Sequence, residues 1–137
     1  MRKLLLVLVL GLLLGLVACG GGSAPAEEEG QAAPSGDVAA GESLYNQSLI
    51  GTQAGCMTCH SLEPGVVMVG PSMANIGAEA ASRVSGQGAE EYLRQSILEP
   101  DAYLVEGFGQ GLMPAGYGDE LSEEQLNDLV AYLLTLN

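Results

Sequence analysis

The chain has 137 residues, enough for one small domain with appended segments. It carries 17 acidic and 4 basic side chains, and its formal net charge is −13. A surface this acidic repels nucleic acid and anionic lipid headgroups, so partners of these two kinds are excluded. The acidic residues either form a solvated surface that keeps the protein soluble or provide a docking face for a basic partner.

The N-terminal segment has the pattern of an export signal. Two basic residues precede an apolar run of about 14 residues, Leu4 to Val17, which is shorter than the roughly 20 residues of a membrane-spanning helix. The run ends in the letters LVAC, at Cys19, and resembles the lipobox of bacterial lipoproteins. The resemblance implies a lipoprotein signal peptide at residues 1–18 and a lipid anchor on the Cys19 thiol. The alternative is an uncleaved, short membrane anchor. Either way, we expect the folded part to lie on the extracytoplasmic face of the bacterial cell membrane.

A flexible linker is predicted next. The lipidated cysteine and this linker together make up residues 19–36, and residues 20–36 read GGGSAPAEEEGQAAPSG, without a large apolar side chain. Such a composition cannot form a packed core. As a random coil, the segment would span roughly 23 Å on average. It would let a domain at residues 37–137 move over the membrane surface while staying attached.

Three helices are predicted in this domain. The first begins with Asp37 as its N-cap and carries Gly41 and Tyr45, and the second covers Ala89 to Leu98, where Pro100 ends it. The third starts with a capping box at Ser122 and has an apolar stripe at helical spacing, formed by Leu126, Leu129, Val130, Leu133 and Leu134. No run alternates in the manner of a strand, so the sequence predicts an all-α fold.

The segments between these helices are long and rich in glycine, proline and serine, as at residues 65–77 and 107–118. The whole chain has one Phe and no Trp. A helical domain of about 100 residues with so much loop buries little core to offset its conformational entropy. A large apolar cofactor on which the loops pack would supply the missing core.

The letters CMTCH, from Cys56 to His60, carry the strongest chemical signal. Two thiols at this spacing can join the two vinyl groups of a haem, and the histidine that follows can reach the iron. A structural zinc site needs further Cys or His ligands, but His60 is the only histidine in the chain. A thioredoxin-like dithiol needs a strand–turn–helix context that is not evident here. The pattern therefore favours one covalently bound haem with His60 as an iron ligand.

The second axial ligand is predicted to be Met113. A second histidine does not exist, and lysine occurs only near the N-terminus. Met57 lies inside the pentapeptide, and Met68 and Met73 follow His60 too closely to reach the opposite side of the haem. Met113 lies in a loop before the last helix, from which it can cross to that side. The alternative is that Met113 simply fills the core.

These residues resemble the small, single-haem c-type cytochromes with His/Met ligation, and the resemblance covers residues 37–137. It implies the cytochrome c fold, with three to five helices around one covalently bound haem c. It also implies that the Pro71 carbonyl accepts a hydrogen bond from His60, and that Gly41 lets the first and last helices cross closely. Residues Asn46 to Gly55 are an insertion relative to close relatives, and the ring of lysines used for docking by mitochondrial relatives is absent.

The stretch from Gly70 to Leu136 is further similar to the single-haem cytochrome subunits of bacterial respiratory complexes, either alternative complex III or terminal oxidases. The implied function is one-electron transfer in a respiratory or photosynthetic chain, without catalysis by this chain itself. The implied partners are a quinol-oxidising complex and an oxidase or reaction centre, which would dock through a basic or apolar surface. The alternative functions are a haem peroxidase and a haem-based ligand sensor. Whether the chain is a permanent subunit or a tethered carrier stays open.

Overall fold

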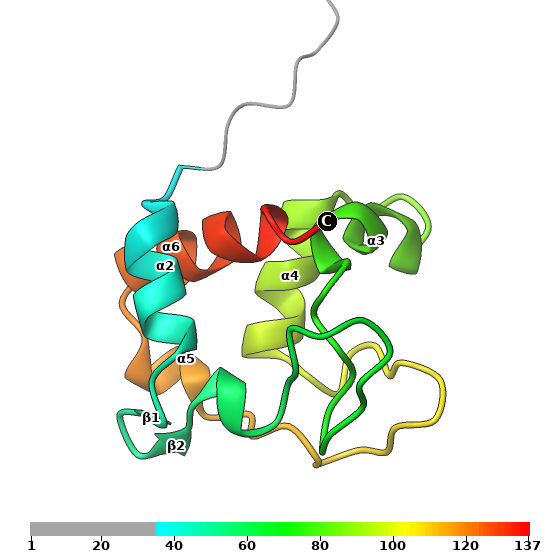
Figure 1. Cartoon of the computed structure of the whole chain (residues 1–137), viewed down its shortest axis with the longest axis horizontal. Coiled ribbons are helices and arrows are strands. Elements are labelled where there is room, and N and C mark those ends of the chain that lie inside the picture. The colour runs from blue at the N-terminus through cyan, green and yellow to red at the C-terminus, as the bar shows by residue number, and fades with distance from the viewer. Residues whose placement is uncertain (1–34) are drawn as a thin grey trace, which may run out of the picture. The chain divides into compact units, whose positions relative to one another are not determined.

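The computed structural model describes residues 35–137, which form one unit. The predicted signal peptide, Cys19 and all of the predicted linker except Ser35 and Gly36 lie outside the described residues. Within the described part, no helix is both long enough and apolar enough to cross a membrane. This part contains five α-helices, labelled α2 to α6, and one short hairpin (Figure 1).

The first and last helices form as predicted. Helix α2 (Val38–Tyr45) begins after Asp37, whose carboxylate accepts hydrogen bonds from the backbone N–H groups of Ala39 and Ala40. Helix α6 (Glu123–Leu134) begins with a capping box, in which the Ser122 and Gln125 side chains each accept a hydrogen bond from the other's backbone N–H. These bonds satisfy N–H groups that have no partner within the helix.

Helices α2 and α6 cross at Gly41, as the sequence predicts. A Cβ atom at this position would overlap the carbonyl oxygen of Asp128 in α6, so only glycine allows this approach. The rings of Tyr45 and Tyr132 pack beside the crossing with their centroids 5.5 Å apart. The apolar stripe of α6 is buried here, with Leu129 only 1% exposed. The crossing therefore supplies the main protein core.

Helix α4 (Ala89–Leu98) has the predicted bounds, but helices α3 (Ile76–Arg83) and α5 (Tyr117–Glu120) were not predicted. Helix α3 buries only Ile76 and Ala80, which is too little to give an apolar periodicity in the sequence. Its first turn is instead held by a hydrogen bond from the Gly77 N–H to the Leu136 carbonyl oxygen, 2.9 Å long. Helix α5 is a single turn.

The expectation that the domain has no strands was wrong in one place. Strands β1 (Leu49–Ile50) and β2 (Gln53–Ala54) pair antiparallel within the insertion at residues 46–55. Gly51 turns the hairpin with a φ of 57°. Two-residue strands are too short to show alternation, so no sequence pattern could reveal them. The fold remains the all-α fold that was predicted.

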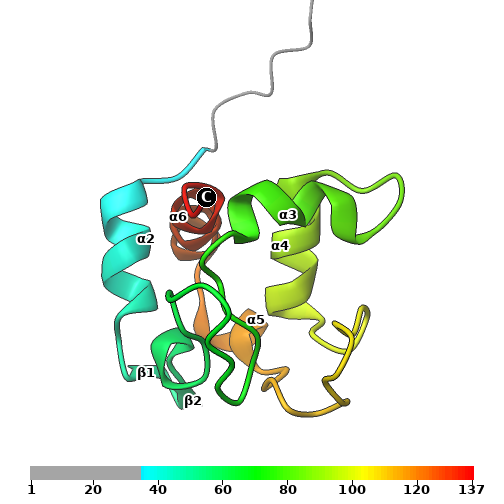
Figure 2. The ribbon, with the colours of Figure 1, turned by 45° about the vertical axis from the view of Figure 1, so that its right-hand side comes forward.

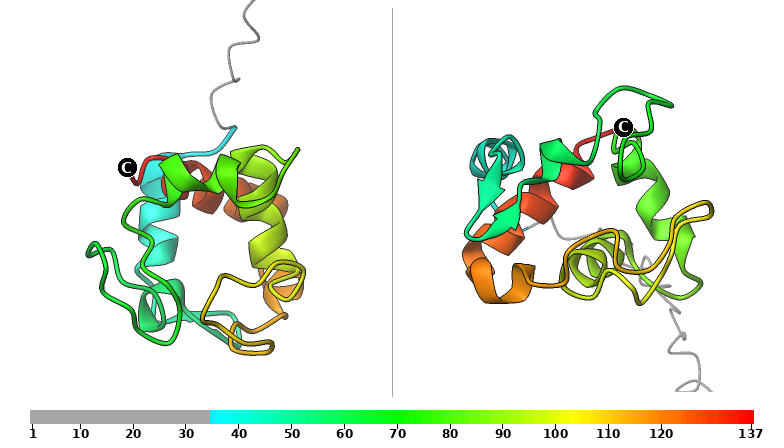
Figure 3. Two further views of the ribbon diagram at one scale, coloured as in Figure 1. Left: turned by 90° about the vertical axis from the view of Figure 1, so that its right-hand side faces the viewer. Right: turned by 90° about the horizontal axis from the view of Figure 1, so that it is seen from below.

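The helices and loops surround a central space. Helices α2 and α6 lie on one side and α3 and α4 on another, while two long loops, residues 59–75 and 99–116, close the lower part (Figures 1 and 2). The two views of Figure 3 show the same ring of elements from the side and from below. The N-terminal end of α2 lies at the opposite end of the domain from both loops.

Candidate functional site

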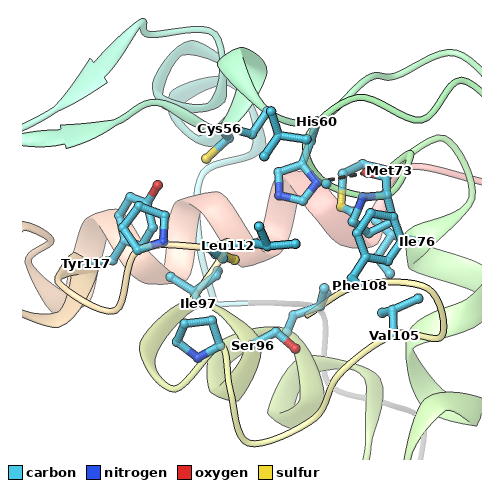
Figure 4. Close-up of a pocket in the computed structure, with 18 of the residues that line it drawn as sticks. Cys56, His60, Met73, Ile76, Ser96, Ile97, Val105, Phe108, Leu112 and Tyr117 are labelled. Carbon is cyan, nitrogen blue, oxygen red and sulfur yellow. Dashed lines mark hydrogen bonds between the residues drawn. The ribbon is translucent and has the colours of Figure 1, made fainter. Parts of the chain in front are cut away.

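The central space is a cavity with apolar walls. All five site residues that were predicted within residues 35–137 line it, namely Cys56, Cys59, His60, Pro71 and Met113. The empty space, including the part that opens to solvent, is about 1110 Å³. This is slightly above the roughly 300–1,000 Å³ that is usual for ligand cavities. Figure 4 shows Cys56 and His60 on one wall, with Leu112, Ile97 and Phe108 across from them.

A single tight turn places the two cysteines and the histidine together. The short 3-10 helix η1 (Cys56–Thr58) follows Gly55, and the His60 N–H donates to the Cys56 carbonyl oxygen over 2.9 Å. The Thr58 hydroxyl donates to the carbonyl oxygen of Gly55 over 2.6 Å, which fixes the start of the turn. The residues between the two cysteines thus form one turn, and Cys56, Cys59 and His60 all face the same cavity.

The His60 ring is held in one orientation. Its Nδ1 atom lies 2.8 Å from the Pro71 carbonyl oxygen, which can only accept, so Nδ1 carries the proton. Burial lowers the pKa of His60 below its usual value, while the hydrogen bond to Pro71 opposes this shift. The ring is therefore neutral at pH 7 and its Nε2 atom has a free lone pair. This is the form in which histidine binds a metal.

The backbone of Gly70 packs against this ring. A Cβ atom at Gly70 would lie 2.7 Å from Nδ1 of His60, closer than a carbon atom can approach without displacing the ring. The Gly70 N–H also donates to the Cys59 carbonyl oxygen over 2.9 Å. The loop after the pentapeptide thus folds back onto it, and Gly70 and Pro71 fix two sides of the same imidazole.

Cys56 lacks the lowered pKa that is typical of a reactive dithiol. Both cysteines are free thiols, and burial raises the pKa of Cys56 to about 11, with a further contribution from the nearby Cys59. Reactive dithiols have lowered pKa values, because the thiolate is the nucleophile. Among residues 35–137, no group of three or more His, Cys, Asp or Glu side chains converges to hold a metal. The arrangement thus fits neither a thioredoxin-like pair nor a structural zinc site.

Of the four methionines in the described residues, two line the cavity and two do not. Met113 reaches it from the loop between α4 and α5, and it is partly buried against the core. Met73 lies beside His60 (Figure 4), because its N–H donates to the carbonyl oxygen of Ser61, right after the pentapeptide. Met57 and Met68 are exposed and lie outside the cavity. Met113 is therefore the methionine that approaches the cavity from an element remote from His60.

Sequence reasoning missed several residues that shape the cavity. The Tyr45 hydroxyl donates to the carbonyl oxygen of His60 over 3.1 Å, and the Tyr117 hydroxyl donates to that of Ala54 over 2.6 Å. Burial raises the pKa of both tyrosines, that of Tyr117 to about 12, so both hydroxyls keep their protons. These bonds hold the pentapeptide from both flanks. Their sequence signal is only the presence of a tyrosine in each helix.

The cavity walls carry no cationic side chain. Arg83 and Arg94, the two basic residues of the described part, form ion pairs elsewhere, with Glu79 and Glu123 respectively. The one acidic lining residue, Asp101, accepts a hydrogen bond from the Gly111 N–H over 2.9 Å. An apolar, nearly uncharged cavity with two thiols, one neutral imidazole and two thioethers suits a flat apolar metal complex attached through sulfur.

A comparison with protein families agrees with this geometry. The family model named Cytochrome c matches residues 38–137. The chain belongs to the cytochrome c family. The match covers most of the chain and all of the cavity. A search of curated proteins found no match.

Membership in the cytochrome c family identifies the cofactor as covalently bound haem c. Cys56 and Cys59 fit the Cys-x-x-Cys-His motif through which this haem is attached. The family also establishes haem-based electron transfer as the general function and redox proteins as the general class of partner. The cavity fits this cofactor in its apolar lining and in the sulfur and nitrogen donors on its walls.

Proposed function

We propose that this cytochrome is a lipid-anchored electron carrier in which His60 and Met113 are the axial iron ligands. The observation that carries the assignment is the convergence of Cys56, Cys59, His60 and Met113 on one apolar cavity, from two segments of the chain. When bound, haem c supplies an iron atom that accepts and releases one electron. The protein then has to hold that iron in one coordination state and connect it to partners.

The residues around the cavity meet the first requirement. The Pro71 carbonyl fixes the His60 ring, and Gly70 leaves room for it, so the free Nε2 atom has a defined direction. Met113 provides a soft thioether, and histidine with methionine is the ligand pair of cytochromes c. The apolar walls disfavour the additional positive charge of the oxidised state, which raises the reduction potential. With His60 and Met113 both bound to the iron, no position would be left there for a substrate.

The location follows from the N-terminal sequence. The proposal places a diacylglycerol on Cys19 after removal of residues 1–18, on the extracytoplasmic face of a bacterial cell membrane. The segment 19–36 then serves as the tether of the domain. Electrons would arrive from a quinol-oxidising complex and leave to an oxidase or a photosynthetic reaction centre. The similarity to single-haem subunits of alternative complex III or oxidases supports a place within or next to such an assembly.

One experiment tests both the anchor and the assembly. Cells that produce the wild-type chain or the Cys19→Ala variant are separated into a membrane fraction and a soluble fraction. The membranes are solubilised in a mild detergent, and both fractions are run on a native gel and stained for haem. We expect wild-type haem in the membrane fraction, and Cys19→Ala haem in the soluble fraction with unchanged haem content. Wild-type haem in a large assembly indicates a built-in subunit, and haem at low mass indicates a tethered carrier. Membrane residence of the variant without any partner would contradict the anchor.

Carbon monoxide tests the electron-carrier assignment against a peroxidase or a ligand sensor. Both alternatives need an iron position that exogenous ligands can occupy, whereas a stable Met113 bond blocks it. We expect the reduced wild-type protein to keep its absorption spectrum under carbon monoxide and the Met113→Ala variant to change it. Tight binding by the wild type would contradict the proposal.

A further inference from the structure

An exposed apolar loop follows directly after the pentapeptide. Its eight residues, Leu62 to Val69, include five large apolar side chains, each more than a third exposed. Val67 is 62% exposed and Met68 is 48% exposed. Only Val69 among these five lines the cavity, so a cofactor there cannot cover the other four. We name the set of Leu62, Val66, Val67 and Met68 the apolar loop.

The apolar loop is held in place next to the pentapeptide, although its four side chains do not line the cavity. Its end is fixed by the hydrogen bond from the Gly70 N–H to the Cys59 carbonyl oxygen. Its start is fixed by the Ser72 hydroxyl, which donates to the carbonyl oxygen of Glu63 over 2.7 Å. The loop is therefore a positioned surface beside the cysteines that attach the haem. In Figure 3 this green segment runs along the outside of the domain.

The charge distribution leaves this surface almost neutral. From residue 53 to residue 78, the sequence contains one charged side chain, Glu63. The other acidic residues lie before this stretch or after it, and many gather at the start of α4 and in α5 and α6. A chain with 17 acidic residues thus has only one of them, Glu63, in the stretch where its haem is attached. Charge depletion around exposed apolar side chains is typical of the centre of a protein interface.

We propose that the apolar loop is the docking surface for a redox partner whose own docking surface is apolar and uncharged. This inference rests on the proposed function and names the partner chemistry for the same haem site. Of the two partner surfaces expected from the sequence, basic or apolar, we infer the apolar one, because Glu63 is the only acidic residue in the stretch that contains the haem attachment. A partner on this loop would lie next to Gly70, whose N–H donates to the Cys59 carbonyl oxygen, and this keeps the electron path short.

Two other occupants fit the loop less well. A second copy of this chain would bring two strongly acidic molecules together, and their like charges oppose association. A lipid surface usually attracts apolar segments flanked by basic or aromatic residues, and the stretch from residue 53 to residue 78 has no Lys, Arg, Trp, Tyr or Phe. A protein surface of matching polarity has neither disadvantage.

A matched pair of variants tests the proposal. Val67→Glu places a charge in the apolar loop, and Leu49→Glu places the same charge at a residue that is 60% exposed, in the β1 strand outside the cavity. Full-length variants are expressed in a strain that lacks its own copy. Membranes are reduced with duroquinol, and the rates of haem c reduction and of reoxidation by oxygen are measured. Haem content and midpoint potential are determined for each variant.

We expect Val67→Glu to slow reduction or reoxidation about tenfold, because a buried valine contact is replaced by a charge that must lose its water. Leu49→Glu should match the wild type, and both variants should keep haem content and potential. The wild-type rate should change little between low and high salt, whereas docking of an acidic face on a basic partner weakens steeply with salt. Equal rates for the two variants, or a steep salt dependence, would overturn the inference.

The other outcomes are distinguishable. If wild-type haem is neither reduced by duroquinol nor reoxidised by oxygen, the proposed function fails, and this inference fails with it. If full-length Cys19→Ala protein binds phosphatidylcholine vesicles and Val67→Glu abolishes that binding, the occupant is lipid. If the same protein sediments as a dimer that Val67→Glu dissociates, the occupant is a second copy. Either result overturns the assignment to a redox partner.

Discussion

The Nδ1 atom of His60 and the carbonyl oxygen of Pro71 lie 2.8 Å apart, and Gly70 packs on the same ring. Gly70→Ala would therefore displace the imidazole, because the added methyl group has no room. We expect the variant to lose about 1–3 kcal/mol of stability and to show a changed midpoint potential. Urea unfolding and a redox titration would measure the two effects.

Gly88→Ala is the control for this prediction. Gly88 lies at the start of α4 with a φ of −74°, and a Cβ atom there would have no heavy atom within 4 Å. Its stability and potential should remain close to those of the wild type. If Gly70→Ala behaves like Gly88→Ala, the close contact with His60 does not constrain the ring.

Met113 and Met73 form a second matched pair, because both line the cavity and both are partly buried. We expect Met113→Ala to lose the red charge-transfer band of the sulfur–ferric iron bond and to lower the potential by on the order of 0.1 V, within the ~0.8 V range that axial ligands control. Met73→Ala should keep the band and lose only packing energy, about 2–5 kcal/mol at most. Loss of the band in Met73→Ala alone would show that the ligand comes from the His60 side.

Gly41→Ala tests the helix crossing. Alanine is the better helix former by roughly 0.5–1 kcal/mol, but its methyl group would overlap the Asp128 carbonyl oxygen, which cannot rotate away. We expect a net loss of about 1–3 kcal/mol in the free energy of unfolding. Ser43→Ala, on the exposed side of the same helix, should be neutral or slightly stabilising. A Gly41→Ala variant as stable as Ser43→Ala would mean that α2 and α6 can separate without cost.

The hydrogen bonds between Glu120 and the hairpin should make stability depend on pH. Its carboxylate accepts hydrogen bonds from the hydroxyl and the N–H of Thr52, and these bonds lower the pKa of Glu120. A lowered pKa means that the stabilisation is complete above the usual carboxyl pKa and is lost as the pH falls below it. Glu120→Gln should therefore be less stable than the wild type at pH 7, and the difference should shrink towards pH 3. Thermal unfolding at several pH values measures this, and a difference that does not depend on pH would contradict it.

Removal of the haem should affect the loops more than the helix crossing. In Cys56→Ala/Cys59→Ala protein, residues 61–75 and 99–116 lose the group on which they pack, while the α2–α6 contact has its own buried core. We expect fast amide hydrogen exchange in both loops and residual protection in α6. Uniform protection throughout the domain would show that the protein core alone holds the loops.

The parts of the fold that could be predicted from the sequence are those with strong local patterns. Asp37, the capping box at Ser122 and the stripe of α6 are local patterns, and the structure has both helices as predicted. Helix α3 and the hairpin at residues 46–55 depend on contacts far away in the chain, with Leu136 and Glu120 respectively. These long-range contacts leave no pattern in the neighbouring sequence, so the two elements could not be predicted.

The candidate site divides in the same way. The pentapeptide is contiguous, so its chemistry could be recognised from the letters alone. The approach of Met113 to the cavity could be predicted only by eliminating the other methionines. The hydroxyl contacts of Tyr45 and Tyr117 could not be predicted, because they reach backbone carbonyls that every residue has. The apolar residues of the apolar loop can be read in the sequence. Only the structure shows that they are exposed and lie outside the cavity.

The attachment of the chain just before α2 has a mechanical consequence. Gly36 fits closely against the α6 backbone at Asn127, and the Asp37 N–H donates to the Asp128 carboxylate over 2.7 Å. A pull on the N-terminal segment is therefore transmitted to the α2–α6 crossing, at the end of the domain away from the two cavity loops. The two cavity loops stay outside the path of that force. If the proposed anchor at Cys19 holds the domain through this end, tension from the membrane would act on the helix crossing and would not pull directly on the loop that carries Met113.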